Sequence, residues 1–143
     1  MIIYFAETTV AEQRGLLCRW TERFHTEKKP VQILVDSMYE AQTIDQLLWT
    51  FAQGSFIPHS IFNPGEAPPD DPVVITPVEA RLSGFDTLIC DLPADLEFIF
   101  EFETAVHFIM RDDEQRRGQS RALWQKARES RADTVHVPYG NQP

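Results

Sequence analysis

Basic and aromatic side chains recur at helical spacing in the segment Arg111–Arg131. At about 3.6 residues per turn, four of these side chains fall within an arc of about 60°: Arg117, Arg121, Trp124 and Arg128. A guanidinium group can bind a carboxylate through two parallel hydrogen bonds, and an indole beside it offers apolar area to another ring. The pattern therefore predicts either a receptor for a peptide with carboxylates and an aromatic end, or a solvated basic face with Trp124 lying over neighbouring apolar stems.

The rest of this segment favours a helix that packs on a sheet. Acidic residues come first and bases last, which is the charge order that a helix macrodipole prefers, and Asp112 or Asp113 is the expected N-cap. Gly118 weakens the helix interior by about 1 kcal/mol relative to alanine, so the first turn can start after the acids. Four small or apolar side chains occupy a different side and are expected to pack inward: Ser120, Leu123, Ala127 and Ser130.

A second aromatic group lies in the segment Asp45–Ser60, which has the pattern of a helix end followed by a stop at Gly54. The short loop after the stop carries Phe56, Pro58 and His59. The preceding helix, numbered from Ser37, has one apolar stripe for the core: Met38, Ala41, Ile44, Leu47, Leu48 and Phe51. Trp49 lies well off the centre of that stripe. Trp49 and Phe56 are therefore predicted to form a partner-binding patch, or else to fold over the edge of the domain's own core.

The chain also holds residues that could serve an enzyme. Cys90 and Asp91 end a predicted strand, where α/β sheets often place catalytic groups, and His59 or His107 could act as the base. No Gly-x-Ser-x-Gly motif accompanies them. Cys18 lies in a helical pattern and Cys90 in a strand pattern, which indicates two buried thiols in a reducing compartment. Neither the cysteines nor the four histidines have metal-site spacing, so we expect no metal and no other cofactor.

The composition predicts a single acidic domain spanning residues 1–143. The net charge is −9, yet seven of the thirteen Lys and Arg residues lie in Arg111–Pro143. An acidic body argues against direct binding of single-stranded DNA, an alternative that would bring affinity for an oligonucleotide alone and a steep salt dependence. No apolar run is long enough to cross a bilayer, and the apolar start Met1–Ala6 lacks the basic region of a signal peptide. We therefore expect a cytoplasmic location and no membrane contact.

The order of the elements predicts an open, mostly parallel α/β sheet flanked by helices. This layout is Rossmann-like, but the first strand runs into Ala6-Glu7-Thr8-Thr9 without the Gly-x-Gly-x-x-Gly loop that binds a dinucleotide. Thr8 or Thr9 is the expected cap of the first helix, whose inner stripe begins at Val10. Strands are expected at 2–6, 31–36, 73–76, 87–90 and, as the last one, 105–110, with a short helix or turn within 95–102. The remaining segments are a Pro-rich loop at 63–72 and a docked or frayed tail at 133–143.

A leucine pair before Trp49, followed after a short gap by Ser55-Phe56-Ile57-Pro58-His59, resembles the chi subunit of bacterial DNA polymerase III. The resemblance spans most of the chain, with a similar length, an N-terminal strand and helix, and a late strand followed by a basic helix. It implies a non-catalytic accessory subunit of the polymerase III holoenzyme, associated with the clamp loader. Such a subunit links the polymerase to single-stranded DNA-binding protein during DNA replication and meets DNA only indirectly.

The same resemblance assigns a role to the basic helix. Chi proteins bind the acidic C-terminal tail of single-stranded DNA-binding protein, which ends in a phenylalanine carboxylate, with a basic and aromatic helix face. With one extra residue in the turn before the helix, that face corresponds to Arg117, Arg121, Trp124 and Arg128, with Ile109 as an apolar wall. Two departures stand out, because a tryptophan replaces the tyrosine expected at position 124 and Gln125 occupies a position expected to be basic.

The second aromatic group also has a counterpart in the family. Where chi proteins have a psi partner, a tryptophan and a phenylalanine corresponding to Trp49 and Phe56 help to contact it. The resemblance therefore implies that Trp49, Phe56, Pro58 and His59 hold psi or another replication or repair protein, such as a helicase-like partner.

Overall fold

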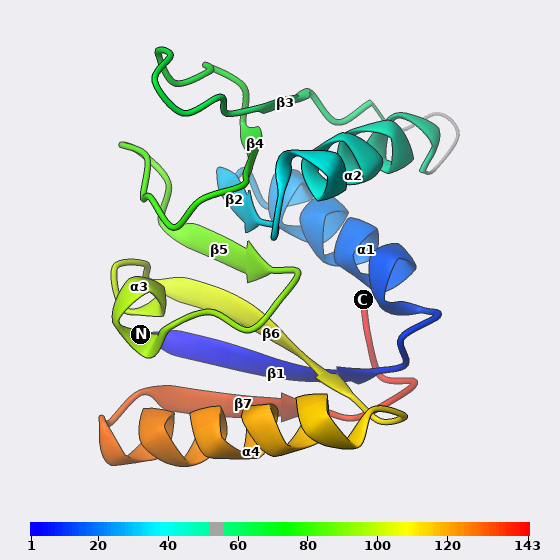
Figure 1. Cartoon of the computed structure of the whole chain (residues 1–143), viewed down its shortest axis with the longest axis vertical. Helices are drawn as coiled ribbons and strands as arrows, with labels where there is room; N and C mark the ends of the chain where they lie inside the picture. Colours follow the sequence, from blue (N-terminus) through cyan, green and yellow to red (C-terminus); the bar gives the residue numbers. More distant parts are fainter. Residues whose placement is uncertain (52–55) are drawn as a thin grey trace.

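Short β-branched runs form the strands of this protein, and amphipathic segments form the helices between them (Figure 1). The computed structural model describes residues 1–51 and 56–143. Within them the strands are β1 (Ile2–Thr8), β2 (Val31–Leu34), β3 (His59–Ile61), β4 (Val73–Thr76), β5 (Thr87–Cys90), β6 (Thr104–Met110) and β7 (Asp133–Val137). The helices in this part of the chain are α1 (Gln13–Thr26), α2 (Met38–Thr50), α3 (Leu96–Ile99) and α4 (Glu114–Glu129).

The described strands form one seven-stranded sheet in the order β3-β4-β2-β5-β6-β1-β7. Every pairing between neighbouring strands is parallel, which confirms the predicted open parallel α/β sheet. In register, Phe5 of β1 lies beside His107 of β6 and His136 of β7. The sheet order therefore brings the N-terminal strand between two strands from the C-terminal third of the chain.

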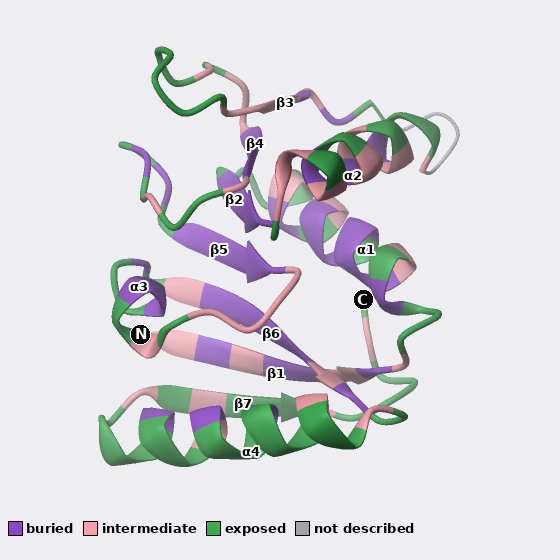
Figure 2. Ribbon diagram, in the orientation of Figure 1, coloured by how far each residue is buried: buried purple, intermediate pink, exposed green. Residues whose placement is uncertain are grey.

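Helices cover both faces of the sheet and create two apolar layers. One layer packs α1 and α2 against one sheet face and is centred on residues such as Trp20, Ile44 and Phe108. The other packs α3 and α4 against the opposite face, where Phe5, Leu88 and Leu123 meet. Figure 2 shows the buried residues concentrated on the strands and on parts of α1 and α2, whereas most of α4 is exposed. The α4 side chains on that exposed face are available for contacts with other molecules.

Several predicted features are confirmed. β4 and β5 have the expected bounds, α3 is the expected short helix within 95–102, and 63–72 lies in the connection between β3 and β4. Ser37 caps α2 by accepting a hydrogen bond from the Glu40 amide at 3.2 Å. On α2, Ala41, Ile44 and Leu48 are buried as the stripe predicted. The predicted stop at Gly54 lies outside the described residues.

The prediction of a tail without regular structure at 133–143 is wrong for its first half, and 105–110 is not the last strand. Residues 133–137 form β7, an edge strand that pairs in parallel with β1. An edge strand needs little apolar content, because its backbone hydrogen bonds to one neighbour hold it. The residues after β7 dock on α1, where the Trp20 indole Nε1 donates to Gln142 Oε1 (3.2 Å) and Arg19 Nε donates to the Pro143 carbonyl (3.0 Å).

Four smaller predictions are also wrong. α1 begins at Gln13, so the Thr9 hydroxyl accepts from the Glu12 amide within a turn that precedes the helix and does not cap it. Val10 lies in that turn and is exposed, and Ser130 at the end of α4 is exposed as well. His59, expected in a loop, is the first residue of β3.

Across the described residues, no helix combines the length and apolar character needed to cross a membrane.

Candidate functional site

Helix α4 is fixed to the sheet by one capped end and one buried side. Asp113 caps it, since the carboxylate Oδ1 accepts a hydrogen bond from the Arg116 amide at 3.0 Å. Leu123 and Ala127 are buried against the sheet, and the Ser120 hydroxyl lies 2.7 Å from His107 Nε2 on β6. These contacts set the rotation of α4 about its axis, so the arginine and tryptophan side chains face outward along the sheet edge.

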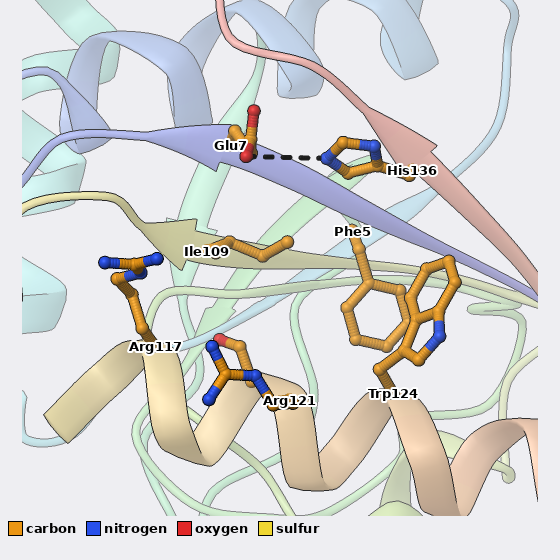
Figure 3. A pocket seen from close by; sticks show the side chains of 8 residues that line it. Phe5, Glu7, Ile109, Arg117, Arg121, Trp124 and His136 are labelled. Carbon is orange, nitrogen blue, oxygen red and sulfur yellow. Dashed lines mark ion pairs between the residues drawn. The ribbon is translucent and has the colours of Figure 1, made fainter. Parts of the chain in front are cut away.

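A pocket of about 310 Å³ lies between α4 and the three strands β6, β1 and β7. It is lined by residues from all four elements: Phe5, Glu7, Ile109, Arg117, Ser120, Arg121, Trp124 and His136. We call it the α4 pocket. Its size falls at the small end of ligand pockets, which suits a single terminal residue and excludes a long segment. Figure 3 shows Arg117, Arg121 and Trp124 along α4, facing the strand residues.

The apolar half of the α4 pocket is built from two aromatic rings and one aliphatic side chain. The Phe5 and Trp124 rings meet edge to face, with centroids 4.9 Å apart and planes 73° apart. Phe5 is fully buried and Trp124 is half-buried, so the indole keeps one side open to the pocket. Ile109 continues this wall on β6 (Figure 3). A ring that enters here would find apolar contacts on several sides.

The charged half of the pocket has two guanidinium groups and one carboxylate. Within residues 1–51 and 56–143, neither Arg117 nor Arg121 has an ion-pair partner. The carboxylate is already engaged, because Glu7 Oε1 lies 3.6 Å from His136 Nε2 and its Oε2 accepts the Tyr139 amide at 3.0 Å. The two arginines are therefore the groups that remain available to an incoming anion.

The structure brings most of the residues predicted from the basic helix into one place. Ile109, Arg117, Arg121 and Trp124 line the same pocket. Arg128 lies in an adjoining hollow with Arg121 and Trp124, one turn further along α4. Sequence reasoning missed Phe5, Glu7 and His136, since their position depends on the insertion of β1 between β6 and β7.

The Trp49/Phe56 patch is a different kind of surface. The Trp49 and Phe56 side chains are 53% and 69% exposed, and their ring centroids lie 5.7 Å apart. These rings therefore do not fold into the core. His59 supports the patch from beneath: it is buried, its ring lies 4.4 Å from that of Trp49, and its Nδ1 is 2.7 Å from the Ile57 carbonyl oxygen. Pro58 is half-buried beside it.

Of the residues considered for an enzyme, Cys90 and His107 lie together, whereas His59 lies on β3, with β4 and β2 between it and β5. The pKa values of Cys90 and His107 do not suit a nucleophile and its base. Cys90 and His107 are neighbours in register on β5 and β6. Burial raises the pKa of the Cys90 thiol to about 12, so the thiol is protonated at neutral pH and is a poor nucleophile. Burial likewise lowers the pKa of His107 to about 4, and its Nε2 is engaged by Ser120. This arrangement is typical of core packing.

A polar cleft at the carboxyl ends of β1, β2 and β5 is the other place where an α/β sheet could hold a ligand. Four of its groups are paired with one another. Gln13 Nε2 donates to the Asp91 carbonyl oxygen (2.6 Å) and to its Oδ1 (3.1 Å), and Arg14 pairs with Glu40 at 2.7 Å. Burial, and then the nearby Glu40 carboxylate, raise the pKa of Asp91. In the part of the chain that the structure describes, no group of three His, Cys, Asp or Glu side chains could hold a metal ion.

The fold and the α4 pocket together define a small parallel α/β protein with a basic and aromatic hollow at one sheet edge. A family model described as "DNA polymerase III chi subunit, HolC" matches residues 1–134, and the chain belongs to this family. A comparison with curated proteins found no match. The chi subunit family is an accessory subunit of the polymerase, so the chain has an accessory role in DNA replication and a partner in the replication complex.

Proposed function

We propose that this chain binds the acidic C-terminal tail of single-stranded DNA-binding protein in the α4 pocket, and so links that protein to the polymerase III holoenzyme. The observation that carries the proposal is the position of the Arg117 and Arg121 guanidinium groups, which have no ion-pair partner among the described residues, beside the apolar wall of the same pocket. A tail that ends in phenylalanine presents a ring and carboxylates within one residue of each other. The pocket offers a complementary group for each.

The expected mode of binding follows from the two halves of the pocket. The terminal ring lies against Phe5, Ile109 and Trp124, where burial of apolar area is favourable. The terminal carboxylate accepts hydrogen bonds from Arg117 and Arg121, and an upstream carboxylate reaches Arg128 in the adjoining hollow. Gln125, which lines the same hollow, offers an amide hydrogen bond where a cation would offer a charge.

The charge distribution supports a protein receptor over a DNA-binding protein. The net charge of −9 repels the phosphate backbone, whereas the exposed arginines of α4 attract an acidic tail locally. Each contact of a bridging subunit can be weak, on the order of micromolar, because linkage raises the effective concentration of the second partner. We propose on this basis that the chain has no catalytic step and meets DNA only through its partners.

The Trp49/Phe56 patch is the proposed contact with the rest of the holoenzyme, through psi or another replication or repair protein. Two exposed rings next to each other are a typical anchor of a protein interface. The patch lies on α2 and beside β3, and the α4 pocket lies beside β7, so the two surfaces occupy opposite edges of the sheet (Figure 1). Both partners can therefore be bound at the same time, as a link to the clamp loader requires.

A calorimetric titration with a short acidic peptide ending in Asp-Ile-Pro-Phe tests the proposal. We expect saturable micromolar binding that disappears when the final Phe is removed and when Arg121 is replaced by glutamate (Arg121→Glu). Lys126→Glu is the matched control, because it makes the same change of charge at an exposed position of α4 that lines neither the pocket nor the adjoining hollow. This variant should bind the peptide as the wild-type protein does. If the folded wild-type protein does not bind the intact peptide, the tail-receptor role is wrong.

A further inference from the structure

Helix α4 carries a second hollow on the side away from the apolar wall. It has a volume of about 280 Å³ and is lined by Glu114, Arg117, Gly118 and Arg121. Arg117 and Arg121 line both this hollow and the α4 pocket, so their side chains separate the two compartments. A ligand that reaches the pocket from this side would cross α4 over Gly118.

Gly118 has no structural reason to be glycine. It lies in the interior of α4, where glycine is unfavourable relative to alanine. Gly65, Gly84 and Gly140 have positive φ, whereas Gly118 has none and sits in regular helix. A Cβ added at Gly118 would meet no atom within 4 Å beyond the helix's own backbone. Neither the backbone conformation nor crowding within the protein therefore explains this glycine.

We propose that Gly118 is a ligand-contact position, at which the main chain of the bound acidic peptide lies directly against α4. The peptide enters through the outer hollow, crosses the helix at Gly118 between Arg117 and Arg121, and ends with its ring in the α4 pocket. This inference rests on the proposed function of that pocket. It adds a second compartment to the site. It also gives Gly118 a role, because a residue without a side chain lets the peptide come close to the helix.

The chemistry of the outer hollow favours a peptide main chain over a free anion. Arg117 and Arg121 attract carboxylates, but the Glu114 carboxylate at the same hollow is an acceptor and repels them. A peptide satisfies both kinds of group, because its amide N–H can donate to Glu114 while its carboxylates lie on the arginines. A glycine permits close approach of a second backbone, and any Cβ would hold that backbone away.

Two substitutions at Gly118 and one in α1 test this inference with the same peptide ending in Asp-Ile-Pro-Phe. Gly118→Ala should raise the melting temperature, since alanine favours the helix, and yet weaken peptide binding by about tenfold. Gly118→Leu should weaken binding further. Gly15→Ala is the matched control: Gly15 is likewise a helix glycine that neither φ nor crowding requires, but it lies in α1 on the opposite sheet face and lines neither hollow, and its added Cβ would make an ordinary contact with Arg19 at 3.7 Å. It should raise stability without changing affinity.

The outcomes separate this inference from the function on which it rests. Wild-type protein that binds the peptide, together with Gly118 variants that are folded and bind equally well, would overturn the role of Gly118 and leave the tail-receptor function standing. Wild-type protein that fails to bind would overturn both. Loss of affinity in Gly118→Ala with a raised melting temperature, and none in Gly15→Ala, is the result that supports the second compartment.

Discussion

The α4 pocket and the Trp49/Phe56 patch each present an indole, but they present it in different surroundings. Trp124 is half-buried, packed edge to face against Phe5, and accompanied by two arginines that have no ion-pair partner in the part of the chain that the structure describes. Trp49 is more than half exposed and has Phe56 and His59 as its aromatic neighbours. The first surface specifies a ring together with an anion, and the second offers mainly apolar area. The pocket therefore limits the chemistry of its ligand far more than the patch limits that of its partner.

This difference fits the two kinds of contact that a bridging subunit makes. A short tail has few atoms, so recognition of it depends on a defined pocket with charge complementarity. A folded partner has a large surface, so a few exposed rings can anchor it while the surrounding contacts exclude water. The two surfaces also lie at opposite edges of the sheet, and a change at one is not expected to alter the other.

The largest expected effect concerns the buried histidines, one of which lies beneath each surface. His107 lies under α4 with its Nδ1 lacking a hydrogen-bond partner among the described residues, whereas both ring nitrogens of His59 face acceptors. Burial lowers the pKa of His107 from 6.5 to about 4. The unfolded chain thus takes up this proton at higher pH than the folded protein, so stability is lost as pH falls from 6.5 toward 4.

We expect His107 to account for about 3 kcal/mol of the loss in unfolding free energy between pH 7 and pH 4. His107→Gln keeps a polar group for Ser120 and removes the titration, so the variant should lose about that much less over the same range. Urea denaturation at several pH values measures both curves. Parallel curves for the wild-type protein and the variant would show that His107 does not have this role, whatever the variant's stability at pH 7.

The next largest effect distinguishes the binding roles of Trp124 and Trp49. Trp124→Ala removes one wall of the pocket and should weaken binding of the peptide ending in Asp-Ile-Pro-Phe by about 2 kcal/mol, or roughly thirtyfold. Trp49→Ala should leave that affinity unchanged and instead weaken binding of a purified psi subunit. Calorimetry with both partners and both variants completes the comparison. Equal losses for the peptide in the two variants would mean that the surfaces are not independent.

The sequence was sufficient for much of the fold and for one face of the site. The predicted bounds of β4 and β5 agree with the observed ones because short buried runs between turn residues have few alternatives. The helical spacing of Arg117, Arg121 and Trp124 put these three residues on one face. The off-stripe position of Trp49 was compatible with exposure or with folding over the core edge, and the structure shows that it is exposed. Each of these features depends on neighbours within a few residues along the chain.

The missing parts of the site depend on contacts between distant segments. Phe5, Glu7 and His136 reach the pocket only because β1 pairs with both β6 and β7, and nothing in the local pattern sets that strand order. β7 itself was missed since an edge strand is half-exposed and lacks a clear apolar alternation. The second hollow on α4 differs from these, because all four residues that line it belong to that helix; its shape depends on the side-chain conformations of Arg117 and Arg121, which helical spacing alone does not give.

The smallest expected effect concerns Glu7, the acid in the α4 pocket. Glu7→Gln removes one negative charge from a pocket that receives an acidic tail, and glutamine can still accept the Tyr139 amide hydrogen bond. Binding of the peptide should tighten by about two- to fivefold, a small gain because Glu7 is partly exposed and its carboxylate already accepts the Tyr139 amide. Glu66→Gln, in the exposed Pro-rich loop, makes the same change in net charge far from the pocket. If both variants gain affinity equally, the effect is general charge steering; a gain confined to Glu7→Gln places the peptide's carboxylates beside β1.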